Sequence, residues 1–154
     1  MKRKLIYILF SCSIILNFIL IYKFFIQGEN VVFTEDKRVE IRMSKENRAF
    51  VMNEMRGFLE SIQQINEGIT KNNPDIILKV SAKSGSGKVH EVPKGLVRSL
   101  PFEFKQMGFQ THELFDEISK ISKENYNREQ IQQKLNQQLN NCISCHKTYQ
   151  ITAQ

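Results

Sequence analysis

The sequence predicts an all-α protein, an up-and-down four-helix bundle preceded by one transmembrane helix. Apolar residues recur at helical intervals through most of the chain, and asparagine and proline stand where helices would end and begin. No segment has a pattern that we interpret as a strand. With 154 residues, of which 41% are hydrophobic and 25% charged, the chain has room for one domain of ordinary size.

The N-terminal segment, residues 1–27, predicts a membrane anchor. No charged residue lies between Leu5 and Tyr22, and a helix that continued to Ile26 would be about 33 Å long, enough to span a bilayer. The basic cluster at residues 2–4 places the N-terminus in the cytoplasm and the rest of the chain outside. The run is longer than a usual signal-peptide core and no small-x-small cleavage site follows it, so we expect a retained anchor, with a cleaved signal peptide as the alternative.

The net charge of +6 does not indicate a nucleic-acid partner. Four of the 22 basic residues flank the apolar run, and the other 18 stand against 16 acidic residues. A basic surface that binds phosphates needs a larger local excess. We therefore expect no nucleic acid as a partner, a polar linker at residues 28–36 and one folded domain at residues 37–154.

Helical periodicity divides that domain into four segments. The first predicted helix spans about residues 37–71, and Asn72-Asn73-Pro74-Asp75 ends it and begins the second, about residues 74–84. The third runs from Pro101 to about residue 123, and the fourth begins at Asn127 with a cap-like Gln130 three residues later. Residues 84–100 are interpreted as a flexible connection, because Gly85 to Lys88 lacks the earlier glycine and the following Ser or Thr of a phosphate-binding loop.

The sharpest signal is Cys142-Ile143-Ser144-Cys145-His146 in the last predicted helix. The pattern C-x-x-C-H is the attachment motif of c-type haem. Two thiols three residues apart lie on one face of a helix, where they can form thioethers to the two haem vinyl groups. His146, four residues after Cys142, can then bind the iron. The sequence therefore predicts one covalently attached haem c.

Two other interpretations of this motif stay open. A Cys-x-x-Cys pair can be a thiol redox centre or half of a zinc site, with the histidine incidental. The chain has no thioredoxin-like βαβ pattern and no second cysteine pair that would complete a four-ligand zinc site. A haem-free thiol-redox or metal-binding helical protein is the alternative that follows from these interpretations.

From about residue 37 onward the chain resembles the class II c-type cytochromes, the cytochrome c′-like four-helix bundles. The haem motif lies in the last helix, Tyr149 follows His146 by three residues, and the first helix contains Arg48-x-x-x-Met52. The resemblance covers about three quarters of the chain, and only the haem motif is strongly specific. Gln150 stands where family members commonly have a basic residue after the tyrosine, and a membrane anchor is not typical of the soluble family members.

The resemblance implies which residues complete the iron site. The helix position four after the arginine faces the iron opposite the histidine, so Met52 is the first candidate for a sixth ligand and Met55, one turn on, the second. Both could instead be core methionines that fill gaps between helices. Arg48 is a candidate for contact with a haem propionate or with an acidic residue. His112 is a candidate for a structural role, a propionate contact or distal ligation.

We expect the function to be electron transfer, with a redox partner protein, a homodimer as one candidate state, and no enzymatic activity. Because bacterial haem attachment occurs outside the cytoplasmic membrane, the anchor predicts a single-pass protein of the cytoplasmic (inner) membrane with its haem domain in the periplasm. Where the iron position opposite the histidine is open, family members are five-coordinate and bind small gases. Binding or sensing of nitric oxide or carbon monoxide is therefore the alternative function.

Overall fold

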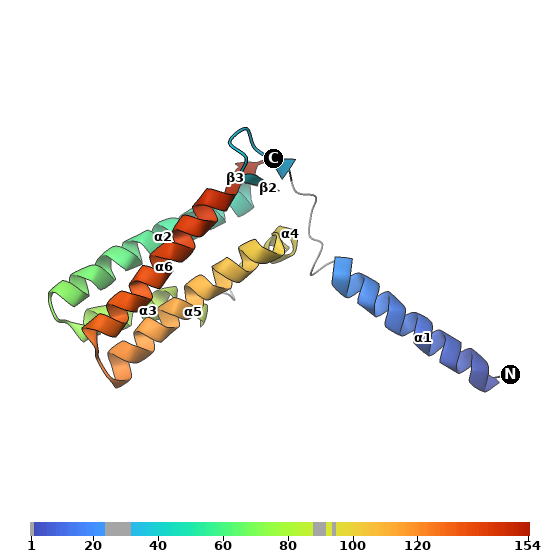
Figure 1. Ribbon diagram of the computed structural model, residues 1–154, viewed down its shortest axis with the longest axis horizontal. Coiled ribbons are helices and arrows are strands. Elements are labelled where there is room, and N and C mark those ends of the chain that lie inside the picture. The colour runs from blue at the N-terminus through green and yellow to red at the C-terminus, as the bar shows by residue number, and fades with distance from the viewer. Residues whose placement is uncertain (1, 24–31, 88–91, 94) are drawn as a thin grey trace.

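The computed structural model describes residues 2–23, 32–87, 92–93 and 95–154, and this part of the chain is mostly helical, as predicted. Helices α2, α3, α5 and α6 pack together side by side, whereas α1 lies apart from them (Figure 1). The helices are α1 (Lys2–Ile21), α2 (Lys45–Thr70), α3 (Pro74–Ser84), α4 (Leu96–Ser99), α5 (Phe102–Glu124) and α6 (Arg128–Thr148). The strands are β1 (Val32–Phe33), β2 (Val39–Met43) and β3 (Tyr149–Ala153).

Two of the predicted helix starts are confirmed by their caps. The side chain of Asn73 accepts hydrogen bonds from the backbone N–H groups of residues 75 and 76, and Pro74 occupies the first turn of α3. Asn127 accepts a bond of 3.0 Å from the N–H of Gln130 at the start of α6. These side chains satisfy N–H groups that a helix end would otherwise leave without a partner.

The largest hydrophobic core lies between α2, α3, α5 and α6, and each helix contributes the apolar stripe that its periodicity predicts. Burial of side chains of this size stabilises the folded state by about 1.5–3 kcal/mol each. The members are Ile62, Ile65, Ile77, Val80, Phe115, Ile118, Ile131 and Leu135. This core holds the halves of α2 and α6 that lie far from the predicted haem-attachment motif, and so positions the remaining halves beside each other.

The expectation that the chain has no strand is wrong. β2 pairs antiparallel with β1 and parallel with β3, in a sheet of order β1-β2-β3. The segment Val39-Glu40-Ile41-Arg42-Met43 alternates apolar and polar residues, which is a strand pattern rather than a helical one. The first long helix of the domain therefore begins at Lys45, after the cap Ser44, and not at residue 37.

The sheet ties together the two ends of the domain. β2 directly precedes α2, β3 directly follows α6, and their register pairs Ile41 with Ile151. Ile41 and Met43 are 3% exposed and lie in a second hydrophobic cluster with Leu96, Leu100 and Phe104. The parallel pairing thus holds the N-terminal end of α2 and the C-terminal end of α6 at the same end of the molecule.

The segments predicted as linkers also contain ordered structure. β1 lies within residues 28–36, and α4 lies within residues 84–100; the remaining parts at 28–31, 88–91 and 94 lie outside the described residues. Leu96 and Leu100, at 2% and 8% exposure, belong to the second cluster. Residues 95–100 therefore form part of the core and are not a flexible connection.

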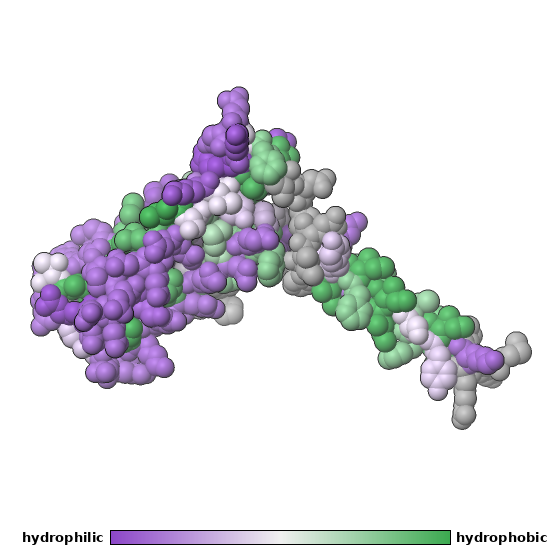
Figure 2. Space-filling view, in the orientation of Figure 1, coloured by the Kyte–Doolittle hydropathy of each residue, from purple (hydrophilic) through white to green (hydrophobic). Residues whose placement is uncertain are grey.

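Helix α1 differs from the rest of the chain in its surface. Figure 2 shows hydrophobic residues along α1 and hydrophilic residues over most of the visible face of the helical domain. Three of the large apolar side chains of α1, Ile8, Phe10 and Phe18, are 59–68% exposed. By length and mean hydropathy, no helix within the described residues qualifies as a membrane span.

The close packing of α2 on α3 predicts a difference between two glycines of α2. A Cβ atom at Gly68 would lie 2.5 Å from Cγ1 of Ile77 and 3.3 Å from the carbonyl oxygen of Asn73, whereas a Cβ at Gly57 would have no atom within 4 Å. We expect Gly68→Ala to lower the free energy of unfolding by about 1–3 kcal/mol through overpacking. Gly57→Ala should raise it by about 0.5–1 kcal/mol, because alanine favours the helix. Urea denaturation followed by circular dichroism in detergent measures both, and equal stabilisation by the two variants would contradict the packing of α2 on α3.

Candidate functional site

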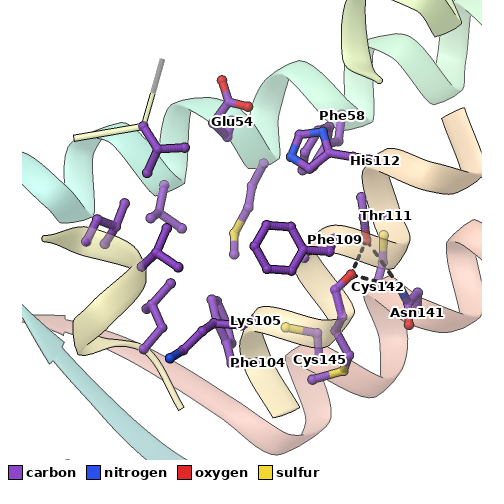
Figure 3. A pocket seen from close by; sticks show the side chains of 18 of the residues that line it. Glu54, Phe58, Phe104, Lys105, Phe109, Thr111, His112, Asn141, Cys142 and Cys145 are labelled. Carbon is purple, nitrogen blue, oxygen red and sulfur yellow. Dashed lines mark hydrogen bonds between the residues drawn. The ribbon is translucent and has the colours of Figure 1, made fainter. Parts of the chain in front are cut away.

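The predicted haem-attachment motif lies on an apolar pocket between α2, α4, α5 and α6 (Figure 3). The cavity volume is about 170 Å³, below the roughly 300–1,000 Å³ of pockets that hold drug-sized molecules, and the pocket is open to solvent on one side. The apolar side chains that line it are Phe50, Val51, Met55, Phe58, Val92, Leu96, Val97, Leu100, Phe104, Met107 and Phe109. A flat apolar molecule would find water-excluding walls on several sides.

Cys142, Cys145 and His146 all line this pocket from the last two turns of α6. Both cysteines are half-buried free thiols, and their spacing of three residues places them on one face of the helix. His146 is exposed and lies in the last turn. The structure therefore brings together the three residues of the predicted attachment motif at one wall of one cavity.

The environment of the two thiols keeps them protonated. Burial raises the pKa of the Cys142 thiol. Burial, with a smaller contribution from neighbouring Cys142, raises the pKa of the Cys145 thiol to about 11. A catalytic redox thiol usually has a lowered pKa, because the thiolate is the nucleophile. The pocket thus offers two neutral thiols beside apolar space.

Arg38, the residue before β2, bonds to the last residue of the motif and to β3. Arg38 donates from Nη1 to the carbonyl oxygen of His146 at 3.5 Å and from Nη2 to the side chain of Gln150 at 3.1 Å. The rings of Phe104 and Tyr149 meet edge to face with centroids 5.3 Å apart. The end of α6 is therefore fixed to α5 and to the strand before α2, which limits movement of the motif.

The two methionine candidates for a sixth ligand differ in position. Met55 lines the pocket and packs in the same cluster as Cys145, whereas Met52, also half-buried, is not among the lining residues. Both belong to α2 and stand three residues apart, so they lie on the same side of the helix with an offset of about 60° around its axis. The structure places the second candidate, not the first, beside the motif.

Arg48 also lies away from the pocket lining. Its Nε donates to the carbonyl oxygen of Ile151 at 3.5 Å, which connects the first turn of α2 with β3. The lysine that lines the pocket is Lys105 on α5, and the carboxylate that lines it is Glu54 on α2. Sequence reasoning did not single out these two residues, because tertiary packing decides which face of α2 and of α5 lines the pocket.

Hydrogen bonds between α5 and α6 hold the part of α6 that carries the cysteines against α5. The amide of Asn141 donates to the carbonyl oxygen of Met107 at 3.0 Å and to Oγ1 of Thr111 at 3.2 Å, as the dashed lines in Figure 3 show. Since Asn141 directly precedes Cys142, these bonds fix the rotation of α6 that turns the thiols toward the pocket.

Comparison with family models, with curated proteins and with solved structures gives no match to this chain. Across the described residues, no three His, Cys, Asp or Glu side chains converge as ligands of one metal ion would. The function must therefore be inferred from the pocket and its residues.

Proposed function

We propose that this chain is a membrane-anchored monohaem c-type cytochrome that transfers electrons on the periplasmic side of the cytoplasmic membrane. One observation carries the proposal: an apolar pocket has Cys142, Cys145 and His146 of a C-x-x-C-H motif along one wall. The four packed helices would be the up-and-down bundle of the class II cytochromes, with a small sheet added at one end.

The residues of the pocket fit a haem in three respects. The thiols of Cys142 and Cys145 would form the thioethers, and each would be consumed as a neutral thiol, which agrees with their raised pKa. The apolar rings of Phe58, Phe104 and Phe109 would cover a macrocycle and lower the dielectric around it. Lys105 is the pocket's lysine and is suited to a propionate.

The haem iron would supply one-electron chemistry between its ferric and ferrous states. His146 would bind it from α6, and the thioether of Met55 would bind it from α2. We favour Met55 over Met52 because Met55 lines the pocket beside Cys145. A thioether raises the reduction potential relative to a second imidazole, which suits an electron carrier that works with a redox partner protein.

The methionine assignment predicts a difference between two conservative variants. Met55→Leu should abolish the methionine-to-iron charge-transfer band at the red edge of the ferric spectrum, because leucine fills the same volume without a ligand atom. Met52→Leu, the matched control on the same helix, should keep the band. The wild-type ferrous protein should show a sharp low-spin α band.

Two outcomes would count against this account. Loss of the band in Met52→Leu with retention in Met55→Leu would return the ligand to the residue that the family resemblance implies. A high-spin wild-type spectrum, with tight binding of carbon monoxide and nitric oxide, would replace electron transfer with gas binding.

We also propose that α1 anchors the protein in the membrane. Exposed apolar side chains along α1 form a surface larger than soluble proteins usually show, and lipid is a partner that would cover it. We expect the full chain in the membrane fraction after an alkaline carbonate wash. Ile15→Lys, at the centre of the apolar run from Leu5 to Ile26, should move part of the protein to the supernatant, because a lysine at the centre of a membrane-spanning helix costs about 2.5–3.5 kcal/mol. Wild-type protein in the wash supernatant would contradict the anchor.

A further inference from the structure

His112 lies at the pocket on α5 and has a fixed orientation. Its Nδ1 atom is 2.8 Å from the backbone carbonyl oxygen of Ser84, and its ring meets the edge of Phe58 with centroids 5.1 Å apart. Figure 3 shows the imidazole beside Phe58, at the side of the pocket where Glu54 of α2 also lies. The side chain is half-buried and lines the same cavity as Met55 and Cys145.

The acceptor that holds His112 is itself fixed. Ser84 ends α3 and is 8% exposed, and its hydroxyl shares a hydrogen bond of 2.8 Å with the hydroxyl of Ser61 on α2. One turn along α5 from His112, the carboxylate of Asp116 accepts a bond of 3.0 Å from the N–H of Ser86. The imidazole is thus held by a part of the backbone that three helices position.

This contact determines the tautomer of the neutral ring. A carbonyl oxygen only accepts hydrogen bonds, so Nδ1 of His112 must carry the hydrogen. Nε2 then carries a lone pair and no hydrogen. The same arrangement, with one ring N–H bonded to a backbone carbonyl and the other nitrogen free to ligate, is typical of histidines that bind metals.

No side chain or backbone group in the described part of the chain donates a hydrogen bond to Nε2 of His112. In its neutral form that atom cannot donate to a gas molecule bound at the iron, whereas it can bind the iron itself. The pocket therefore holds two potential distal ligands from different helices, the thioether of Met55 and the imidazole of His112.

We propose that His112 is a second distal ligand, whose Nε2 takes the sixth position of the iron when the Met55 thioether does not. The inference rests on the proposed haem site and adds a ligand exchange to it. In this exchange the bond from the iron to the Met55 sulfur would break and a bond to Nε2 of His112 would form, and no proton would be released, because Nε2 carries none. An imidazole in place of a thioether lowers the reduction potential, so the choice of ligand would set the potential of the carrier.

Three variants of the full chain with covalently attached haem test this proposal. Met55→Leu removes the thioether. His112→Asn removes Nε2, while the asparagine amide can still donate to the carbonyl of Ser84, so a purely structural role is kept. The double variant removes both ligands. The readouts are the ferric spin state by electron paramagnetic resonance and the reduction potential.

We expect Met55→Leu to stay low-spin with a lower potential than the wild type, and His112→Asn to keep the methionine band. The double variant should become high-spin. If Met55→Leu is already high-spin and matches the double variant, His112 does not reach the iron and the inference falls, although the haem site stands. If none of the proteins carries covalent haem, the proposed function itself has failed, and this inference with it.

Discussion

The parallel pairing of β2 with β3 is the constraint on which the site depends. It joins the residues just before α2 to those just after α6, so the N-terminal half of α2 must lie opposite the C-terminal half of α6. The pocket opens between these two halves, with α4 and α5 as its other walls. Buried Ile41 and Met43 anchor the pairing, and Arg38 and Arg48 donate hydrogen bonds to the backbone carbonyls of His146 and Ile151.

The two hydrophobic clusters stabilise different parts of the domain. The larger cluster packs the four helices against one another at the end of the domain far from the motif. The smaller cluster packs β2 against α4 and α5. Cys142 packs against the first cluster and Cys145 against the second, so the motif lies where the two meet. A molecule bound to both thiols would complete the core between them. We therefore regard the pocket as a gap in the core that the proposed haem would fill.

Much of the helical domain could be predicted because its signals are local. The cap at Asn73, the first-turn Pro74 and the cap at Asn127 act within three or four residues, and all three lie where the sequence indicates. The motif at Cys142 to His146 is local in the same sense. The strands escaped prediction because β2 has five residues and becomes a strand by pairing with a segment more than one hundred residues away. The alternation of Val39 to Met43 and of Tyr149 to Ala153 was the available signal.

The residues of α2 that face the motif were harder to predict, for a physical reason. Met52 and Met55 share one apolar stripe, and the rotation of α2 about its axis decides which of them faces the motif. That rotation depends on the packing of α2 against α6 and on the sheet, which are non-local. The same rotation turns Arg48 toward β3. Lys105 and the wall from Leu96 to Leu100 likewise reach the pocket only through the tertiary arrangement.

The central claim is that Cys142 and Cys145 carry a haem. Its most direct test is the intact mass of the denatured protein, produced in cells that contain the haem-attachment machinery. We predict the mass of the polypeptide plus one haem, and the mass of the polypeptide alone for the variant with both Cys142→Ala and Cys145→Ala. A wild-type protein that has the mass of the bare polypeptide would contradict the claim.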